Sequence, residues 1–272
     1  MLLLAGCPGD GADSGGAAGS AAAGSAPTGL LVLHALGTSG VDPFAYLSFE
    51  RYAPSSSGEI SAVAALIEQV TGDATGAAIA PGGCAKLSTT PSALPAGLPK
   101  ALDFGPTIAL LDSMGQSRFS LASTANDGFY QFSGKGDLFG FDGRVGFPPG
   151  ALEKETRLSF TMPPRYVVNG GSAVAADSEA LTIPLEPQAP EGSDFVVRFQ
   201  SRGIQCKPTV QQESGLRTAL RIIHANIAGD VGKLGTEQSM EVNVIPPRAK
   251  LPLQQDTVIA RPWVTVPGRY VY

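Results

Sequence analysis

Residues 194–200 have the sequence DFVVRFQ, and their pattern decides the fold class of the chain. Large apolar side chains occupy every second position, at Phe195, Val197 and Phe199. The positions between them carry Val196, Arg198 and Gln200. Successive side chains of a β-strand point to opposite faces of a sheet, so this segment has one apolar face and one mixed face. The pattern therefore predicts a half-buried strand.

Similar short segments follow one another from residue 29 onward. The predicted strands are 29–36, 44–52, 107–111, 118–122, 128–132, 157–162, 180–185, 194–200, 240–245 and 257–266. Turn-forming residues separate them, for example at 126–128, 148–150 and 169–171. Short strands with turns between them are typical of β-sandwiches. The sequence therefore predicts an all-β fold of one or two sandwich modules with at most one or two short helices.

Two segments do not follow the strand pattern. Residues 61–70 are rich in alanine, and a short helix and a strand are equally good interpretations there. Residues 214–227 place apolar side chains at helical spacing, at Leu216, Leu220, Ile223 and Ile227. Ser214 precedes them as a possible N-cap, so we expect a helix in this segment.

Composition and charge exclude one class of partner. The 272 residues include 34 glycines and 22 prolines, only 16% are charged, and the formal net charge is -5. A nucleic-acid-binding surface needs clustered lysines and arginines, which this chain does not have. The basic residues near the C-terminus are predicted to be solvated surface residues: Arg248, Lys250, Arg261 and Arg269.

The N-terminus resembles the lipobox of bacterial lipoproteins. Residues 4–7 have the sequence LAGC, in which small residues precede the cysteine that takes the lipid. The resemblance implies that Cys7 is the lipid attachment point. Residues 1–6 are interpreted as a truncated signal peptide, because a complete signal has a basic region and a longer apolar run. The resemblance also implies export to the cell envelope, with the outer membrane or the cell surface as the expected location.

A flexible tether is predicted between the lipid and the folded part. The segment that follows Cys7, residues 8–28, is almost entirely glycine, alanine, serine, proline and aspartate. Such a segment has no large apolar side chains to bury, so it cannot offset the entropy cost of ordering. We therefore divide the chain into the signal remnant 1–6, the lipidated tether 7–28, and β modules at 29–150 and 151–272. The turn-rich segment 146–150 is the predicted boundary.

The middle of the chain resembles poorly characterised bacterial lipoproteins with Ig-like β-sandwich modules. The resemblance rests on residues 102–108, LDFGPTI, and residues 127–136, DGFYQFSGKG. It covers about a third of the chain and implies Ig-like modules and an extracytoplasmic location. It supplies no catalytic residues, so Asp103 and Tyr130 are interpreted as residues of the fold.

A search for catalytic and metal-binding motifs gives no candidate nucleophile, cofactor site or metal site. The two histidines, His34 in a predicted strand and His224 in the predicted helix, are interpreted as structural residues. Two acidic side chains are enough for a glycosidase, so pairs of carboxylates are possible catalytic residues. The candidate pairs are Glu153 with Glu155, Asp177 with Glu179, and Asp137 with Asp142. All lie in turn-rich surroundings, where we expect solvated surface charges. Residues 137–142 also lack the ligand spacing of known calcium-binding loops.

The cysteines allow one disulfide. If Cys7 carries lipid, Cys84 and Cys206 remain as a pair in an oxidising compartment. We expect both near the surface at sheet ends, where a bond would join the two modules. The alternative, two isolated buried thiols, is equally compatible with the sequence.

Two functions remain as hypotheses. The first is a lipid-anchored binding or structural module, not an enzyme, whose loops contact an envelope protein or a glycan. The second is a lipid-anchored hydrolase that acts on envelope or extracellular glycans through a carboxylate pair. Neither hypothesis requires a cofactor or nucleic acid.

Overall fold

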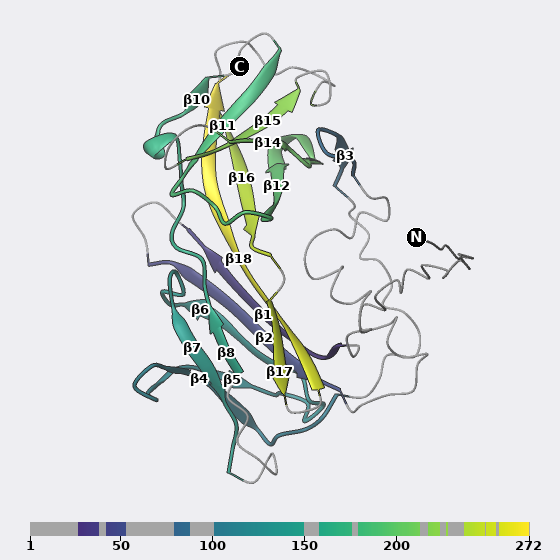
Figure 1. The fold of residues 1–272 in the computed structure, drawn as a ribbon, viewed down its shortest axis with the longest axis vertical. Coiled ribbons are helices and arrows are strands. Elements are labelled where there is room, and N and C mark those ends of the chain that lie inside the picture. The colour runs from purple at the N-terminus through teal and green to yellow at the C-terminus, as the bar shows by residue number, and fades with distance from the viewer. Residues whose placement is uncertain are drawn as a thin grey trace, which may run out of the picture.

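The computed structural model describes residues 27–37, 42–52, 79–87, 101–149, 158–175, 179–212, 217–223, 227, 237–247, 249–253 and 256–271. These residues are predominantly strand (Figure 1). The short 3-10 helices η1 (Asn169–Gly171) and η2 (Gln200–Arg202) lie between strands. The predicted all-β class is confirmed. Within the described residues, no helix is long and apolar enough to cross a membrane.

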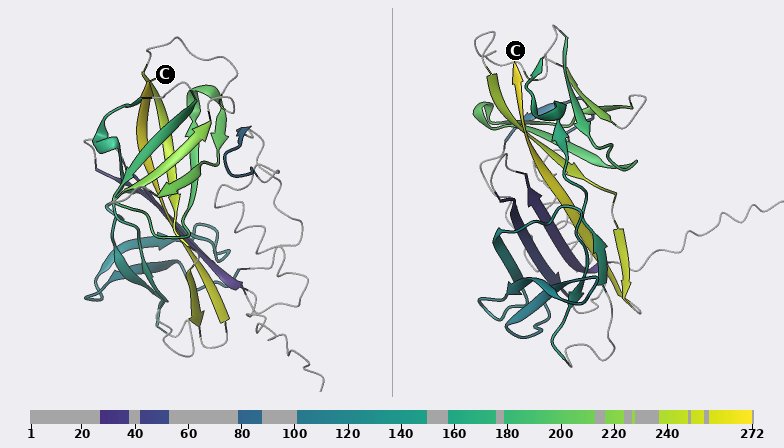
Figure 2. Two further views of the ribbon diagram at one scale, coloured as in Figure 1. Left: turned by 45° about the horizontal axis from the view of Figure 1, so that its top comes forward. Right: turned by 90° about the vertical axis from the view of Figure 1, so that its left-hand side faces the viewer.

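The first half of the molecule is built from one strongly curled sheet. Its strands are β1 (Pro27–Leu36), β2 (Phe44–Arg51), β4 (Thr107–Asp112), β5 (Ser117–Ala122), β6 (Tyr130–Lys135), β7 (Asp142–Gly146), β8 (Leu158–Thr161) and β17 (Ala249–Leu253). The first part of β18 (Asp256–Val271) completes the set. In Figure 2 the sheet turns back on itself, and β6 continues it from β2 toward β5, β4, β7 and β8.

The inside of this curled sheet is the first hydrophobic core. Its members come from alternate positions of the strands, as expected for segments with one buried face. Leu33, Leu47, Phe49, Leu110 and Leu121 are fully buried in it. Phe119 and Phe160 lie at its rim, each in edge or tilted contact with Phe141. Such aromatic pairs contribute to stability beyond their buried area.

The second half is a sandwich of two sheets. One layer consists of β3 (Cys84–Lys86), β13 (Ile204–Cys206), β12 (Asp194–Phe199), β16 (Glu237–Ile245) and the second part of β18. The other layer has the order β14 (Thr209–Gln212), β15 (Thr218–Ile223), β11 (Ala180–Glu186), β9 (Val167–Val168). The short strand β10 (Val174–Ala175) pairs with β18. The predicted sandwich architecture is confirmed.

The second core lies between these two layers. Phe195, Val197 and Phe199 of β12 are buried there, as the alternation in residues 194–200 predicts. Val242 and Val244 of β16 extend the same surface. They pack against Leu181, Ile183, Leu220 and Ile222 of the opposite sheet.

Strand β18 belongs to both halves. Its Val258 and Ala260 lie in the first core, and its Val264, Val266 and Tyr270 lie in the second. Along one edge it pairs in parallel with β1 and then with β10. Along the other edge it pairs in antiparallel fashion with β16 and β17, which are separated at Pro246 and Pro247. Because proline has no N–H, it suits this interruption of the ladder.

The predicted ranges 29–150 and 151–272 do not each form a closed unit by themselves. Strands β8 and β17 come from the second range but complete the sheet of the first core. Strand β3 comes from the first range but pairs with β13 beside the second core. Of the predicted boundary segment 146–150, residues 146–149 are described and follow directly from the end of β7 at Gly146, whereas residues 150–157 lie outside the described residues.

The helix predicted for residues 214–227 is wrong at residues 218–223, whereas Ile227 is in helical conformation. Residues Thr218–Ile223 form β15, in the interior of the four-stranded sheet between β14 and β11. Leu220 and Ile222 face the second core, whereas Ile223, a member of the helical pattern, is 47% exposed. Pairing on both edges and burial of alternate residues outweigh the weak local preference for helix. The ambiguous segment 61–70 lies outside the described residues.

Arg261 corrects a second prediction. The sequence predicts a solvated surface residue, but Arg261 is only 5% exposed, because it lies in the interior of β18 with β1 paired alongside. Arg269 is half-exposed, as expected, while Arg248 and the side chain of Lys250 lie outside the described residues.

Candidate functional site

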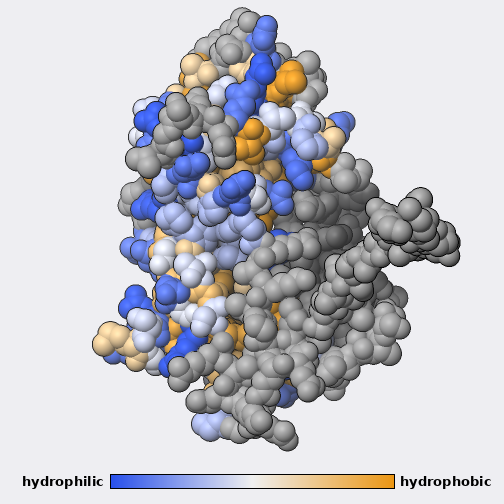
Figure 3. Space-filling view, in the orientation of Figure 1, coloured by the Kyte–Doolittle hydropathy of each residue, from blue (hydrophilic) through white to orange (hydrophobic). Residues whose placement is uncertain are grey.

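A groove of about 550 Å3 lies beside the second part of β18. Its walls come from the segment around β9 and η1, from β16 and β18, and from Gly37 just after β1. The volume falls within the roughly 300–1,000 Å3 of small-molecule sites. On the face shown in Figure 3 the described residues are mainly hydrophilic, with the hydrophobic ones in small separate groups. The groove therefore has the size of a small-molecule site.

The groove exists because one edge of β18 has a gap in its pairing. The ladder with β1 ends at Leu36 opposite Thr265, followed by a bond from Gly37 N to Thr265 O of 2.9 Å. The ladder with β10 begins only at Val174 opposite Tyr270. Among the described residues, therefore, no strand pairs with residues 266–269 on this side. Pro267 lies in the gap, and a residue without an N–H fits an unpaired strand edge.

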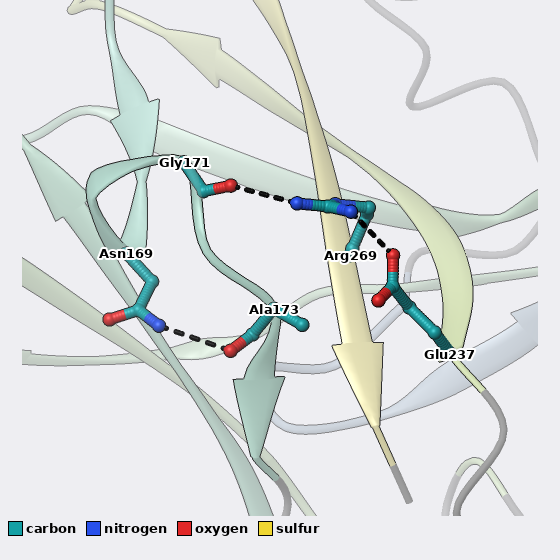
Figure 4. Close-up of polar contacts among 5 residues, drawn as sticks. All are labelled: Asn169, Gly171, Ala173, Glu237 and Arg269. Carbon is teal, nitrogen blue, oxygen red and sulfur yellow. Dashed lines mark hydrogen bonds and ion pairs between the residues drawn. The ribbon is translucent and has the colours of Figure 1, made fainter.

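Arg269 holds one wall of the groove in place (Figure 4). Its Nη1 donates to Glu237 Oε1 at 2.7 Å, and its Nη2 donates to the carbonyl of Gly171 at 3.1 Å. The loop that it holds turns back through left-handed backbone, with φ of +60° at Gly170 and +88° at Gly171. The Asn169 amide also donates to the Ala173 carbonyl at 3.2 Å. Arg269 is thus a positioning residue whose charge is offset by Glu237.

Tyr166 is the polar side chain of the lining that is most deeply buried. It is 3% exposed and belongs to the second core. Its hydroxyl is buried and has no hydrogen-bond partner in the part of the chain that the structure describes. Burial raises its pKa to about 12, so the hydroxyl stays protonated and can donate at neutral pH. A buried hydroxyl that makes no hydrogen bond costs free energy.

The rest of the lining is polar at the rim and apolar below. Ser172 and Ser239 are exposed. Gln200 Nε2 donates to Glu241 Oε2 at 3.1 Å, so one carboxylate oxygen and one amide hydrogen of this pair are already engaged. The apolar part of the lining includes Val168, Met240, Val266 and Pro267. Sequence reasoning did not identify these residues, because they come from segments that only the tertiary fold brings together.

His34 lies outside the groove, in a buried polar chain of contacts. Its Nε2 donates to Thr265 Oγ1 at 2.7 Å, because that hydroxyl itself donates to Asn243 Oδ1 at 2.7 Å. The imidazole also contacts the Trp263 ring, with centroids 4.3 Å apart. Burial, and secondarily the charge of Arg198, lowers the pKa of His34 to about 4. This is the setting of a neutral structural histidine. His224 lies outside the described residues.

Cys84 and Cys206 are joined by a disulfide. They are direct partners in the ladder between β3 and β13, with Cα atoms 4.0 Å apart. The expectation that both lie near the surface is wrong for Cys206, which is fully buried in the second core. The reason is that β13 contributes to the inner face of the sandwich. Cys7 lies outside the described residues.

The carboxylates proposed as catalytic pairs have local structural contacts. Asp137 Oδ1 accepts from the backbone N–H of Phe139, and Asp142 Oδ1 accepts from Thr161 Oγ1. Both side chains are exposed. Glu179 is within 3.7 Å of Arg221. Glu153, Glu155 and Asp177 lie outside the described residues, and among the described ones no three histidine, cysteine or acidic side chains cluster as a metal site would require.

Asp103 and Tyr130 belong to one hydrogen-bonded corner in the first half. The Tyr130 hydroxyl accepts from the Phe104 N–H at 2.6 Å and lies 2.8 Å from the Gly105 carbonyl. Asp103 Oδ1 accepts from the Gly105 N–H at 2.8 Å. Tyr130 is fully buried. These contacts fix the segment before β4 and make both residues part of the fold.

Comparison with known proteins adds little to this geometry. No protein-family model matches the chain, and no curated protein matches it. Among solved structures, the chain is similar to a variant of the major pilin subunit of Bacillus cereus, with 12% sequence identity and a TM-score of 0.20. The match covers 64% of this chain and 66% of the pilin, slightly less than two thirds of the pilin's length. At this TM-score the likeness does not bear on function.

Proposed function

We propose that this chain is an exported, lipid-anchored module of the bacterial cell envelope that binds a partner through the groove beside β18 and performs no catalysis. The observation that carries the proposal is the disulfide between Cys84 and Cys206. Stable disulfides form in oxidising compartments outside the cytosol. The bond also uses two of the three cysteines, which leaves Cys7 as the one thiol available for lipid.

The residues that line the groove favour binding and not catalysis. Glu241 is the acidic residue among the described residues of the lining, and its carboxylate accepts a hydrogen bond from Gln200. A glycosidase needs two carboxyl groups roughly 5–10 Å apart across the scissile bond. Asp137 and Asp142, which could have formed such a pair, instead cap a turn and contact a neighbouring strand. The outer membrane or the cell surface is the location that best fits this module.

Detergent partitioning tests the anchor. The full chain is expressed behind a complete lipoprotein signal peptide in a bacterium with two membranes, and its partition into Triton X-114 is measured. Acyl chains add about 0.8 kcal/mol per buried CH2, so the parent protein should enter the detergent phase and Cys7→Ala should remain in the aqueous phase. The double variant Cys84→Ala/Cys206→Ala is the matched control and should still partition with detergent.

Two results would contradict the proposal. Equal detergent partitioning of Cys7→Ala and the parent protein would remove the lipid anchor. Hydrolysis of an envelope glycan by the purified protein, lost on Glu241→Gln with the fold intact, would show that the groove is an active site.

A further inference from the structure

The loop that contributes Gly171 and Ser172 to the groove also contains an asparagine that is followed by a glycine. We propose that this asparagine, Asn169, is a self-modification site, at which the folded chain loses the side-chain amide without an enzyme. The product changes the contacts that shape this wall of the groove. The proposal needs neither the lipid anchor nor a ligand, so it goes beyond the proposed function.

The reaction uses only the Asn169 side chain, the next backbone nitrogen and water. The Gly170 nitrogen loses its proton and attacks Cγ of Asn169, and the new C–N bond closes a succinimide ring. The bond from Cγ to Nδ2 breaks, and Nδ2 leaves with that proton as ammonia. Water then opens the ring at either of its carbonyl groups, which gives aspartate or isoaspartate. No group is oxidised or reduced, and this reaction is one reason why asparagine is a thermolabile residue.

The surroundings of Gly170 leave the attacking nitrogen accessible. Gly170 and Gly171 are both exposed. A Cβ built on Gly170 would have no described atom within 4 Å apart from its chain neighbours. Glycine also adopts more backbone conformations than any other residue, so the chain at this point can rotate into the ring geometry at little cost.

Asn126 provides the contrast within the same chain. Both asparagines have left-handed backbone, with φ of +48° at Asn126 and +43° at Asn169, and Asn126 is exposed. Asn126 is followed by Asp127, whose side chain obstructs the attack and whose negative charge disfavours deprotonation of the backbone nitrogen. Asn243, which is 1% exposed, is followed by the β-branched Val244. The glycine therefore makes Asn169 the most reactive of the described asparagines.

Deamidation removes one of the contacts that hold the loop. In the parent protein the Asn169 Nδ2 donates to the Ala173 carbonyl at 3.2 Å (Figure 4). An ionised carboxylate only accepts hydrogen bonds, so the product places two acceptors opposite each other and this bond is lost. The bonds from Arg269 Nη2 to the Gly171 carbonyl and from the Ser172 N–H to the Asn169 carbonyl remain. The loop should therefore loosen while the fold persists.

The first experiment compares the folded protein with the unfolded chain. The unlipidated Cys7→Ala form of the full chain is kept at mildly alkaline pH, with and without guanidinium chloride. Alkaline pH favours loss of the proton from the attacking nitrogen. Peptide mapping by mass spectrometry follows amide loss at Asn169 and Asn126, and hydroxylamine traps the succinimide. Asn169 should lose its amide in the folded protein and give both acid isomers, while Asn126 keeps its amide.

Variants test the role of the glycine and the effect of the product. Gly170→Ala keeps the amide but adds a methyl group beside the attacking nitrogen, so amide loss should slow. Circular dichroism checks its folding, because φ of +60° strains an alanine. Asn169→Asp represents the aspartate product, and the NMR signals of residues 170–173 should shift and lose protection from hydrogen exchange. Asn126→Asp makes the same change at the other left-handed asparagine and is the matched control, which should leave those signals unchanged.

Three results would overturn the proposal. If the folded protein keeps the Asn169 amide over the time in which the unfolded chain loses it, the fold protects this residue. Equal amide loss at Asn126 would remove the role of Gly170, and this comparison uses the parent chain, so it does not depend on the folding of Gly170→Ala. Unchanged NMR signals of residues 170–173 in Asn169→Asp would remove the effect on the groove. None of these results bears on the lipid anchor, which detergent partitioning tests separately.

Discussion

At the scale of single residues, burial decides what each polar group does. His34, Tyr130 and Tyr166 are all in the interior or close to it, but their surroundings differ. The first two have hydrogen-bond partners within the fold. The Tyr166 hydroxyl has none among the described residues. Buried tyrosine hydroxyls therefore differ between the two cores, since one is hydrogen-bonded and the other has no described partner.

The pH dependence of stability should report the burial of His34. Its pKa is lowered from 6.5 to about 4 in the folded protein, mainly by burial. The unfolded chain therefore binds the proton more tightly, and the free energy of unfolding should fall as pH decreases from 6.5 to 4 and then change no further. The loss from this residue is about 3 kcal/mol at most, at 1.36 kcal/mol per pKa unit. Urea unfolding at several pH values measures it.

The matched variant for this measurement is His34→Asn. It removes the titrating group, so the difference in pH dependence between parent and variant isolates the histidine. Burial raises the pKa of Glu50, which acts in the opposite direction, but this effect is common to both proteins and cancels. If both proteins show the same slope between pH 6.5 and 4, His34 is not buried in neutral form.

At the scale of elements, the disulfide attaches β3 to the second sandwich. The bonded cysteines are 122 positions apart. The chain-entropy model gives about 5 kcal/mol for closing a loop of this length, before losses from strain or residual structure. Cys84→Ala/Cys206→Ala should therefore lower the free energy of unfolding by about 2–5 kcal/mol, measured by denaturant titration. Thiol titration of the denatured Cys7→Ala protein should find no free cysteine, and two free thiols there would contradict the bond.

The elements differ in how far their sequences predict them. Each predicted strand range overlaps a strand of the structure, because alternation with turns at both ends is a local signal. Strand β6 begins at Tyr130 and not at Gly128, where φ is +80° and an added Cβ would lie 2.6 Å from the Leu102 carbonyl. The short strands β3 and β10 exist only through partners distant in sequence, so no local pattern indicates them.

The groove could not be predicted for the same reason. Gly37, Tyr166 and Pro267 have no common motif and no regular spacing. They meet because the ladder between β1 and β18 ends at Thr265, before the ladder between β10 and β18 begins at Tyr270. The cysteine pair, by contrast, was accessible from composition alone, since an even number remains once Cys7 is set aside. Its burial still depended on the position of β13 in the sandwich.

At the scale of the whole molecule, β18 couples the two cores. A substitution that destabilises one core should therefore also destabilise the other. Leu47→Ala in the first core should cost about 2–5 kcal/mol. We expect slow amide hydrogens of β11 and β15 in the second core to lose protection by the same free energy, in hydrogen-exchange NMR, with a single unfolding transition. Unchanged protection in β11 and β15 would mean that the halves unfold independently.

The parallel ladder between β1 and β18 also sets the order of events during biosynthesis. His34 and Thr265, which are joined across that ladder, are 231 positions apart. At translation rates of about 5–20 residues per second, roughly ten to fifty seconds pass before the ribosome has made the partner of β1. Throughout that time the apolar β1 segment has no strand to pair with on this edge, and neither core is complete. The two cores can therefore close only after nearly the whole chain has been synthesised.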